Sequence, residues 1–499
     1  ASFNKTYDQG KAQVLWTNQV ADLETSVSAY LKLCQDEKYS ILLESVEGGA
    51  IRGRYTFIGL KPDIVWRCNG DSAQINRKAL EGVLEKDFQD SDQPSLMSLR
   101  SLFSESLIDL PEDMPPSAAG LIGYMGYDMV RLMETLPPAK DDALGLPDSL
   151  FIRPTIMVVF DSITDLLTIV TPVRPETDVS ASKARLAAEG RLKEIIDILA
   201  QPIPPKAKNI SVIDKLEEPK SNLSKERFSK MVTKAQEYIT AGDIFQVVLS
   251  QRFSMPFDLP HFELYRALRR TNPSPFLYYL KFDDFSVVGS SPEIFVRLRD
   301  NEVTIRPIAG TRPRGKNALE DKKNAEDLLA DPKECAEHLM LLDLGRNDVG
   351  RVSKVDSVIL TDKMTIEYYS HVMHIVSNVR GEIRDDYDAL KALTAGFPAG
   401  TVSGAPKIRA MEIIDELESE KRGIYAGAVG YFSADGSMDT CIVLRTALVK
   451  DNMMYVQAGA GIVTDSIAEN EYAECEAKAR ALVRAAEVAV NLAKSDKTV

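Results

Sequence analysis

The stretch FLYYLKFDDFSVVGSSPEIFVRLRDNEVTI, residues 276–305, decides the fold class. It contains four short runs that are rich in apolar and β-branched residues, at Phe276–Leu280, Phe285–Val288, Ile294–Leu298 and Val303–Ile305. Turn signals such as Asp283-Asp284 separate these runs. The pattern predicts an antiparallel meander.

Runs of the same kind continue outward from this stretch. Upstream, Phe245–Leu249 is predicted as a buried strand, and a helix before it is indicated by the spacing of Phe228, Met231, Val232, Ala235, Tyr238 and Ile239. Downstream, strands are expected at Ala428–Phe432, Cys441–Leu448 and Met453–Gln457, with turns near Asp435-Gly436 and Asp451-Asn452. Helices are expected near 318–345, 406–419 and 467–494. Strands in runs, with helices in other runs, favour an α+β fold over a doubly wound sheet.

Residues 201–223, rich in proline and charge, form the clearest linker candidate. They predict an N-terminal domain over 1–200 and a C-terminal domain over 224–499, which we expect to interleave in space. A chain of 499 residues can bury a large core without disulfides or structural metals.

The composition is that of a globular protein, with 44% hydrophobic and 27% charged residues. The 60 lysines and arginines are outnumbered by 74 aspartates and glutamates, which gives a net charge of −14. This balance argues against nucleic acid and anionic membrane surfaces as partners. Because the sequence shows neither a membrane-spanning apolar run nor a secretory signal, we expect a cytoplasmic location.

The spacing of the cysteines and histidines limits which metal ions this protein is expected to bind. The five cysteines are far apart and form no C-x-x-C pair, which is typical of a reducing compartment. The four histidines form no H-E-x-x-H pair, so a structural zinc ion is not expected. A hard cation bound by carboxylates stays open.

Two predicted helices carry glutamates on one side. Glu334 and Glu337 are three residues apart, and Glu471, Glu474 and Lys478 follow one another at i, i+3 and i+7. Two carboxylates from each helix could bind one magnesium ion and leave room for a substrate oxygen. On spacing alone, a solvated acidic face with a Glu474–Lys478 ion pair is the better interpretation.

Helix starts and a glycine-rich run are weaker candidates for ligand binding. Ser466 with Glu469 predicts a capping box. In Gly404-Ala405-Pro406 the proline suits a first helical turn, and free N–H groups around Thr401–Ala405 would attract an anion. The run Gln457–Ile462 predicts either close approach of its backbone to a ligand or a tight turn.

Single polar residues at the ends of predicted strands are also candidates. Glu293 could stay protonated against apolar strands and act as a general acid, although a solvated turn glutamate is the simpler interpretation. His371 and His374 are three residues apart, so alternation along a strand would place them on opposite faces. Glu44 and Ser45 would either bind a ligand's ammonium group or cap a turn.

Taken together, the motifs are far more specific than any one of them. Between about residue 35 and residue 490 the chain contains, in order, LLES, RYTFIG, GLIGYMGYDMVR, GDIFQVVLSQRF, NPSPF, GSSPE, RPIAGTRPRG, LLDLGRNDVGRV, HVMHIVS, PAGTVSGAPK and AGAGIV. This series resembles the large subunits of anthranilate synthases, within the family of chorismate-using enzymes.

The resemblance implies a fold and a reaction. The fold is a two-domain α+β sandwich of antiparallel sheets with helices packed outside. The reaction converts chorismate and ammonia to anthranilate and pyruvate, the first step of tryptophan biosynthesis, and requires Mg²⁺. A separate glutaminase subunit supplies the ammonia, and no cysteine of this chain lies in a Gly-x-Cys-x-Gly motif that would hydrolyse glutamine.

The resemblance also implies roles for individual residues. Glu337 and Glu474 match the magnesium ligands, with Glu334 and Glu471 close by and Lys478 balancing their charge; the ion would ease loss of the ring hydroxyl. Glu293 matches the acid that protonates this hydroxyl, and His374 the histidine linked to pyruvate elimination. Arg445 should pair with the enolpyruvyl carboxylate. Further substrate contacts are expected from Gly310, Thr311, Thr401, Gly404, Tyr425, Gly459, Ala460 and Gly461.

Two positions match anthranilate synthases rather than their relatives. Isochorismate- and salicylate-forming relatives have a lysine base that activates water, where this chain has Gln246. The 4-amino-forming relative has a nucleophilic lysine, where this chain has Ala309. The resemblance therefore implies direct amination of the neighbouring ring carbon.

A feedback site for tryptophan is implied as well. It is matched by Glu44, Ser45, Pro275, Phe276, Leu277, Val429 and Tyr431. The family more often has tyrosine and methionine in place of Phe276 and Leu277. Tryptophan would inhibit by favouring a state with a misaligned chorismate site.

Two alternative functions compete with this one. The first is an aminodeoxyisochorismate synthase that stops before pyruvate elimination. The second is a non-catalytic tryptophan-binding subunit, which is disfavoured because each expected catalytic position holds a competent residue type.

Overall fold

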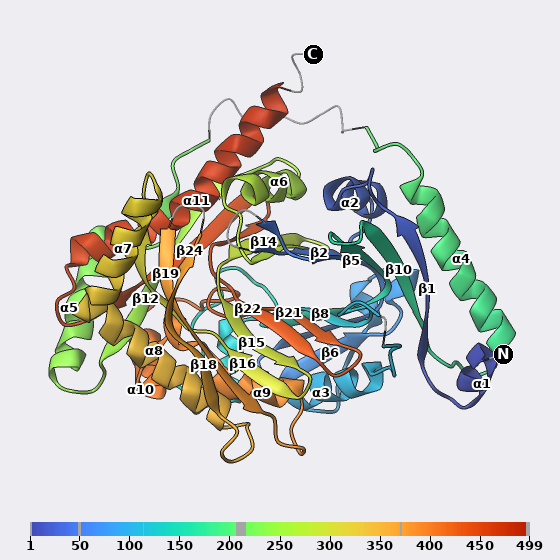
Figure 1. The fold of residues 1–499 in the computed structure, drawn as a ribbon, viewed down its shortest axis with the longest axis horizontal. Helices are drawn as coiled ribbons and strands as arrows, with labels where there is room; N and C mark the ends of the chain where they lie inside the picture. Colours follow the sequence, from blue (N-terminus) through green and yellow to red (C-terminus); the bar gives the residue numbers. More distant parts are fainter. Residues whose placement is uncertain (1, 48–50, 113, 206–215, 370–371, 496–499) are drawn as a thin grey trace.

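The structure is a computed structural model of the chain, and it describes residues 2–47, 51–112, 114–205, 216–369 and 372–495. Two layers of antiparallel strands lie one above the other, with helices outside both (Figure 1). Every pairing between the described strands is antiparallel. The predicted α+β sandwich is confirmed.

The first layer contains the first two strands of the meander over 276–305. Its strands, in spatial order, are β1 (Gln13–Val20), β10 (Leu166–Val173), β9 (Ser149–Asp161), β5 (Tyr55–Asn69), β2 (Ser40–Glu44), β13 (Phe276–Lys281), β14 (Phe285–Ser291), β23 (Thr446–Lys450), β24 (Met453–Ile462), β12 (Gln246–Pro256) and β11 (Lys220–Ser221). A short strand, β20 (Gly404–Ala405), also pairs with β12.

The second layer starts again from β5 and β9, which are long enough to belong to both layers. Its other strands are β7 (Phe88–Asp90), β6 (Ser72–Asn76), β8 (Gly120–Met125), β21 (Ala428–Ser433), β22 (Met438–Ile442), β15 (Ile294–Arg299), β16 (Glu302–Ile305), β17 (Ile308–Pro313), β19 (Val372–Glu382) and β18 (Ile359–Tyr368). A separate hairpin joins β3 (Val46–Glu47) to β4 (Ile51–Arg52).

Helices cover the outer face of each layer (Figure 1). The first layer packs against α2 (Ser26–Cys34), α4 (Ala181–Leu199), α5 (Lys225–Thr240), α6 (His261–Thr271), α10 (Lys407–Leu417) and α11 (Ala468–Ser495). The second packs against α3 (Ser95–Ser106), α8 (Pro332–Gly350) and α9 (Ala389–Gly396). The remaining helices are α1 (Ser2–Asp8), α7 (Ala318–Ala330) and four short 3-10 turns, η1 (Ala79–Glu81), η2 (Glu85–Asp87), η3 (Tyr127–Leu132) and η4 (Gly400–Val402). No helix in the described part of the chain has the length and apolarity to cross a membrane.

Strand β13 shows why this sequence forms a layered sheet. Side chains alternate along a strand, so Leu277 and Tyr279 join the helix-covered core of the first layer, while Tyr278 and Leu280 join the core between the layers. Both faces are buried, and both therefore need apolar side chains. This explains why the run is continuous rather than alternating in polarity.

The two halves of the sequence share this strand network. Strand β2 pairs with β13, and β8 pairs with β21, so strands from before and after residues 201–223 are direct neighbours. Part of that predicted linker is itself a strand, since β11 pairs with β12; residues 206–215 lie outside the described residues. The expected interleaving is thus visible, whereas the domain boundaries stay a prediction.

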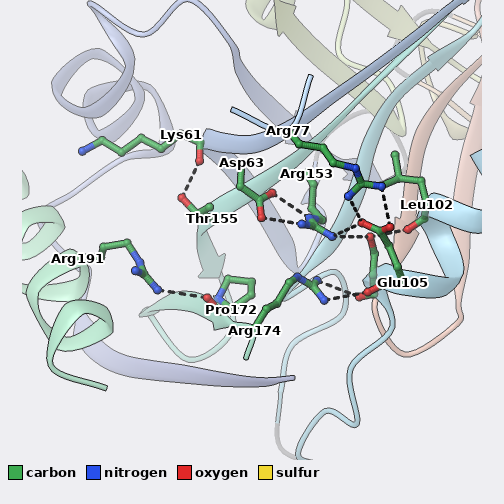
Figure 2. Close-up of polar contacts among 11 residues, drawn as sticks. Lys61, Asp63, Arg77, Leu102, Glu105, Arg153, Thr155, Pro172, Arg174 and Arg191 are labelled. Atoms are coloured by element: carbon green, nitrogen blue, oxygen red, sulfur yellow. Dashed lines mark hydrogen bonds and ion pairs between the residues drawn. The ribbon is translucent and has the colours of Figure 1, made fainter. Parts of the chain in front are cut away.

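A network of charged groups fixes the region where β5, β9 and β10 meet α3 (Figure 2). Arg153 donates to both carboxylate oxygens of Asp63 at 2.8 and 2.7 Å, and Arg77 donates to both oxygens of Glu105 at 2.8 Å. Arg174 donates to the Glu105 carbonyl at 3.1 Å. Bidentate pairs of this kind set the orientation of the strands that carry them.

Two element predictions outside the site are wrong. The helix expected over 318–345 is two helices, because Pro332 starts α8 and the Asp331 side chain accepts from the N–H groups of Lys333 and Glu334 at 2.9 and 3.3 Å. Phe245, expected in a buried strand, precedes β12 and is 72% exposed. The other predicted elements are present with shifted ends, and Cys441–Leu448 is treated with the site below.

Helix α11 lacks the predicted capping box. The helix begins at Ala468, and the Ser466 hydroxyl accepts from the Val463 N–H at 3.0 Å instead of capping it. Ser466 therefore stabilises the turn between β24 and α11 rather than the first turn of the helix.

Candidate active site

Glu293 lies in the short link between β14 and β15 and is 5% exposed. Its Oε1 accepts a hydrogen bond from the Thr401 hydroxyl at 2.8 Å. Burial raises the pKa of this carboxyl to about 8, although Thr401, the Ile308 N–H and Arg445 act in the opposite direction. The group is therefore protonated at neutral pH and can donate a proton. The alternative of a solvated turn glutamate is wrong.

Arg445 interrupts the strand expected over Cys441–Leu448, which is in fact two strands, β22 and β23. Its φ of 47° lies in the left-handed region, which ends regular pairing at this point. Its carbonyl accepts from the Ser290 N–H at 3.1 Å, which holds the backbone beside β14. Burial lowers the pKa of the guanidinium, while Tyr369 and Glu293 favour its charged form.

His374 lies in β19, opposite Thr311 of β17. Its Nδ1 is 3.0 Å from the Gly310 carbonyl oxygen and 3.0 Å from the Thr311 hydroxyl. Since the carbonyl can only accept, Nδ1 carries the proton and Nε2 presents the lone pair. Burial lowers the pKa of the imidazole, so the ring is neutral near pH 7 and can accept a proton at Nε2. His371 lies outside the described residues.

The segment before α10 is part of the sheet. Helix α10 begins at Lys407, so Pro406 precedes the helix rather than forming its first turn. Gly404 and Ala405 pair with β12, so the segment that was expected at a helix start is a short strand. Gly404 has φ +139°, and a Cβ on it would lie 2.2 Å from the Gln246 carbonyl oxygen. Glycine at this position lets the start of β12, and with it Gln246, approach closely.

The glycine-rich run over 457–462 is the end of β24, so the predicted tight turn is wrong. In β12, the N–H groups of Val248 and Ser250 bond to acceptors outside β24, at 2.9 and 2.8 Å. Their partners in register, Gly461 and Gly459, therefore turn their own amides away from β12. The alternation turns the Ala460 amide toward β12, so the substrate contact predicted for it is not available.

Both glycines lie close to side chains of the site. A Cβ on Gly459 would lie 2.8 Å from the Tyr425 hydroxyl, and one on Gly461 would lie 2.3 Å from the Gln246 side-chain nitrogen. The Gly459 carbonyl accepts from Lys478 at 2.9 Å. This edge of β24 thus presents polar backbone groups toward Tyr425, Gln246 and Lys478.

Glutamates of α8 and α11 face each other across this edge. Burial raises the pKa of Glu337, and the charges of Glu334 and Glu474 raise it further, whereas a hydrogen bond from Gln246 lowers it. Burial also raises the pKa of Glu471. The interpretation as a wholly solvated acidic face is therefore wrong for Glu337.

The described residues contain no group of three or more histidine, cysteine, aspartate or glutamate side chains arranged to hold a metal ion. Glu334 accepts from Arg312 at 3.1 Å, and Glu474 pairs with Lys478 at 2.7 Å. Within the described part of the chain Glu337 lacks such an ion pair, and beside it the Gln246 Oε1 is buried without a hydrogen bond. Oxygen donors of this type fit Mg²⁺.

A cavity of about 820 Å³ opens between the two layers. Its lining includes all of the residues predicted for a feedback site, namely Glu44, Ser45, Pro275, Phe276, Leu277, Val429 and Tyr431. These residues come from β2, β13 and β21, or from the links beside them. A volume of this size is typical of small-molecule sites.

Glu44 is already neutralised within this cavity wall. Its carboxylate accepts from Arg269 at 2.5 and 3.0 Å, from Ser26 at 2.6 Å and from Tyr265 at 2.5 Å. Burial raises its pKa, but these partners outweigh burial and the net pKa is lowered. An ammonium group would therefore meet a carboxylate whose charge is shared with Arg269.

Sequence reasoning missed Tyr369 and Arg312. The Tyr369 ring meets the His374 ring edge-on at 5.3 Å, and Arg312 connects Glu334 with Asp331. The pair Tyr368-Tyr369 directly before the histidine-containing strand was the available signal for the first. No pattern marks Arg312, because its partners come from α7, α8 and the turn between them.

Comparison with known proteins agrees with this geometry. A family model described as chorismate binding enzyme matches residues 54–484. The chain belongs to the chorismate binding enzymes. All of the active-site positions described above fall within the matched residues, and the resemblance stated from the motifs is confirmed.

Among chorismate binding enzymes, the chain is similar to anthranilate synthase component 1 of Cereibacter sphaeroides, with 53% identity over 97% of each chain. The corresponding protein of Pseudomonas putida is 47% identical over 94% of each chain. Anthranilate synthase component I from Streptococcus pneumoniae superposes with a TM-score of 0.75 at 38% identity, covering 93% of this chain and 98% of that one. A menaquinone-specific isochorismate synthase from Escherichia coli, 18% identical with a TM-score of 0.70, covers 97% of this chain and shares the fold.

Proposed function

We propose that this chain is the chorismate-aminating component of an anthranilate synthase, which forms anthranilate and pyruvate from chorismate and ammonia. The observation that carries the proposal is Glu293, a buried carboxyl that holds its proton at neutral pH beside Arg445. The near full-length similarity to anthranilate synthase component 1 proteins supports the same reaction.

The residues have separate tasks in this reaction. Glu293 donates a proton to the departing ring hydroxyl, with Thr401 orienting the carboxyl. Arg445 binds the enolpyruvyl carboxylate, and the outward amides of Gly459 and Gly461 bind oxygens of the same substrate. After ammonia has added to the ring, Nε2 of His374 removes the ring proton as pyruvate leaves.

A cation site completes the proposal. Glu337 and Glu474 would hold Mg²⁺, with Glu334 and Glu471 near it, and Lys478, which pairs with Glu474, would balance the charge of the carboxylates. When bound, the ion withdraws electron density from the ring carboxylate and favours loss of the hydroxyl. The neutral Gln246 at the start of β12 hydrogen-bonds Glu337 and has no basic group to activate water, which supports ammonia as the nucleophile.

The remaining parts of the proposal concern regulation, partners and location. Tryptophan is the inhibitor bound in the cavity between the layers, and a glutaminase component supplies ammonia. The designation of the relatives as component 1 supports a second component. All five cysteines are free thiols, which supports the cytoplasm as location.

The test is formation of fluorescent anthranilate from chorismate, ammonium and Mg²⁺ by the purified chain. Glu337→Gln should lower the rate at least about 100-fold by removing a ligand charge. Asp343→Asn on the exposed side of the same helix α8 is the matched control and should leave the rate unchanged. A product that retains the pyruvyl group, detected by mass spectrometry, would instead indicate an aminodeoxyisochorismate synthase. Absence of any product contradicts the proposal.

A further inference from the structure

The cavity between the layers and the candidate active site share one wall. Pro292 and Ile294 line the cavity, while Glu293 between them bonds to Thr401 in the active site. Ile308 lines the cavity as well, and its N–H bonds to the Glu293 carboxyl. A shift of this wall would therefore move the proton donor.

Tyr369 lies in the same wall and contacts both sides. It lines the cavity, and its ring meets the ring of His374 edge-on, with centroids 5.3 Å apart and planes at 68°. Its hydroxyl donates to Glu367 Oε2 at 3.1 Å, and Glu367 in turn pairs with Arg306. Glu367 and Arg306 also line the cavity. A ligand in the cavity can thus reach the groups that hold this ring.

The charges around Tyr369 agree with this placement. Burial raises the pKa of its hydroxyl, joined by the charges of Glu367 and Glu293. The same hydroxyl favours the charged form of Arg445. Tyr369 therefore lies within electrostatic reach of the proton donor and of the cation that binds the substrate.

We propose that Tyr369 is the positioning residue through which a ligand in the cavity acts on His374 and Arg445. The inference rests on the proposed function, because it takes tryptophan as the cavity ligand and chorismate as the active-site ligand. Tryptophan changes the Glu367–Arg306 pair, the Tyr369 ring turns with its hydroxyl partner, and the imidazole loses its contact with this ring. Through this one side chain, binding of either ligand then weakens binding of the other, which we call opposition.

The experiment measures this opposition at equilibrium, without turnover. Tryptophan is titrated into the full chain by calorimetry, with Mg²⁺ and without ammonium, in the absence and presence of saturating chorismate. In the unaltered protein chorismate should weaken tryptophan binding by about fivefold or more. In Tyr369→Phe, which keeps the ring but lacks the bond to Glu367, the ratio of the two Kd values should fall below about twofold. The ratio is taken within each variant, so a general loss of affinity or stability does not change it.

Tyr368→Phe is the matched control. Tyr368 lines the same cavity, and its ring lies beside Arg314, so the same change is made one residue away. This variant should keep the ratio of the unaltered protein. An unchanged ratio in Tyr369→Phe, an equal loss in Tyr368→Phe, or the absence of opposition in the unaltered protein would overturn the inference. Opposition that depends on Tyr369 in a chain forming no anthranilate would support the coupling and contradict the proposed reaction, so the two failures are distinguishable.

Discussion

Individual side chains in this protein acquire their chemistry from burial. Glu293 and Glu44 are both buried carboxyls, yet the pKa of the first is raised and that of the second is lowered. The difference lies in their partners, because Glu44 has the Arg269 guanidinium at hydrogen-bond distance, whereas Glu293 has the neutral Thr401 hydroxyl. One group is a proton donor and the other a structural anion.

Raising the pH should remove the proton from Glu293 and slow the reaction. With a folded-state pKa of about 8, the rate of the chemical step should fall about tenfold per pH unit above that value. The folded protein binds this proton more tightly than the unfolded chain, so the associated stability is fully present below pH 4.5 and is lost as pH rises toward 8. A pH–rate profile and thermal unfolding at pH 6 to 9 check both effects. Glu293→Gln should be inactive and lack this loss of stability; a fully active variant would contradict the assignment.

Removing the charge of Glu44 should destabilise the fold. Glu44→Gln leaves Arg269 largely buried without its anion, and we expect the free energy of unfolding to fall by about 3 kcal/mol. Because the folded-state pKa is lowered, the contribution of Glu44 is present above its usual pKa and lost as pH falls through the folded value. Glu189→Gln, which breaks an exposed pair with Arg185 in α4, should change stability by less than about 0.5 kcal/mol. Denaturant unfolding compares the two; equal effects would contradict the prediction.

Replacing glycine by alanine should have opposite effects on stability in helix α4 and in strand β20. Gly190 lies in α4, and apart from its chain neighbours and the backbone of its own helix, no atom of the described residues comes within 4 Å of the position that a Cβ would take there. Gly190→Ala should therefore stabilise the protein by up to about 1 kcal/mol. Gly404→Ala places a carbon 2.2 Å from the Gln246 carbonyl at φ +139° and should cost about 3 kcal/mol or more. Unfolding midpoints measure both, and a stable Gly404→Ala variant would show that β20 can move away from β12.

At the scale of elements, much of the fold could be predicted from the sequence. The meander over 276–305 was recognisable because each strand contains a short run rich in apolar and β-branched residues, and turn signals separate the runs. The interruption at Arg445 and the strand character of 457–462 were not, because a left-handed residue and a paired glycine run depend on neighbours from β14 and β12. Local pattern predicts which segments are extended, whereas pairing decides where they stop.

In the candidate active site, too, local pattern revealed some features, whereas others depend on contacts between distant segments. The position of Glu293 beside a strand was recognisable, but its burial depends on Thr401, more than a hundred residues later in the chain. The roles assigned from the resemblance needed the whole series of motifs, since no single spacing distinguished a cation site from a solvated helix face. Tyr369 was missed because its role depends on contact with the His374 ring, which local sequence does not reveal.

At the scale of the whole molecule, neither half of the chain should fold alone. A fragment of residues 1–205 has β2 and β8 without their partners β13 and β21, so we expect it to aggregate. Co-expressed with residues 216–499, it should form a 1:1 complex that elutes as one species. Gel filtration of the two preparations checks this, and a monomeric, cooperatively unfolding 1–205 fragment would contradict it.

The pairing of β8 with β21 also implies a delay during synthesis on the ribosome, before β8 can pair with β21. The two strands are separated by about 300 residues, and translation adds about 5–20 residues per second. An emerging β8 therefore waits on the order of 15–60 s before its partner exists. During that interval one edge of this apolar strand lacks its neighbour, so we expect the yield of folded enzyme to rise with chaperone supply.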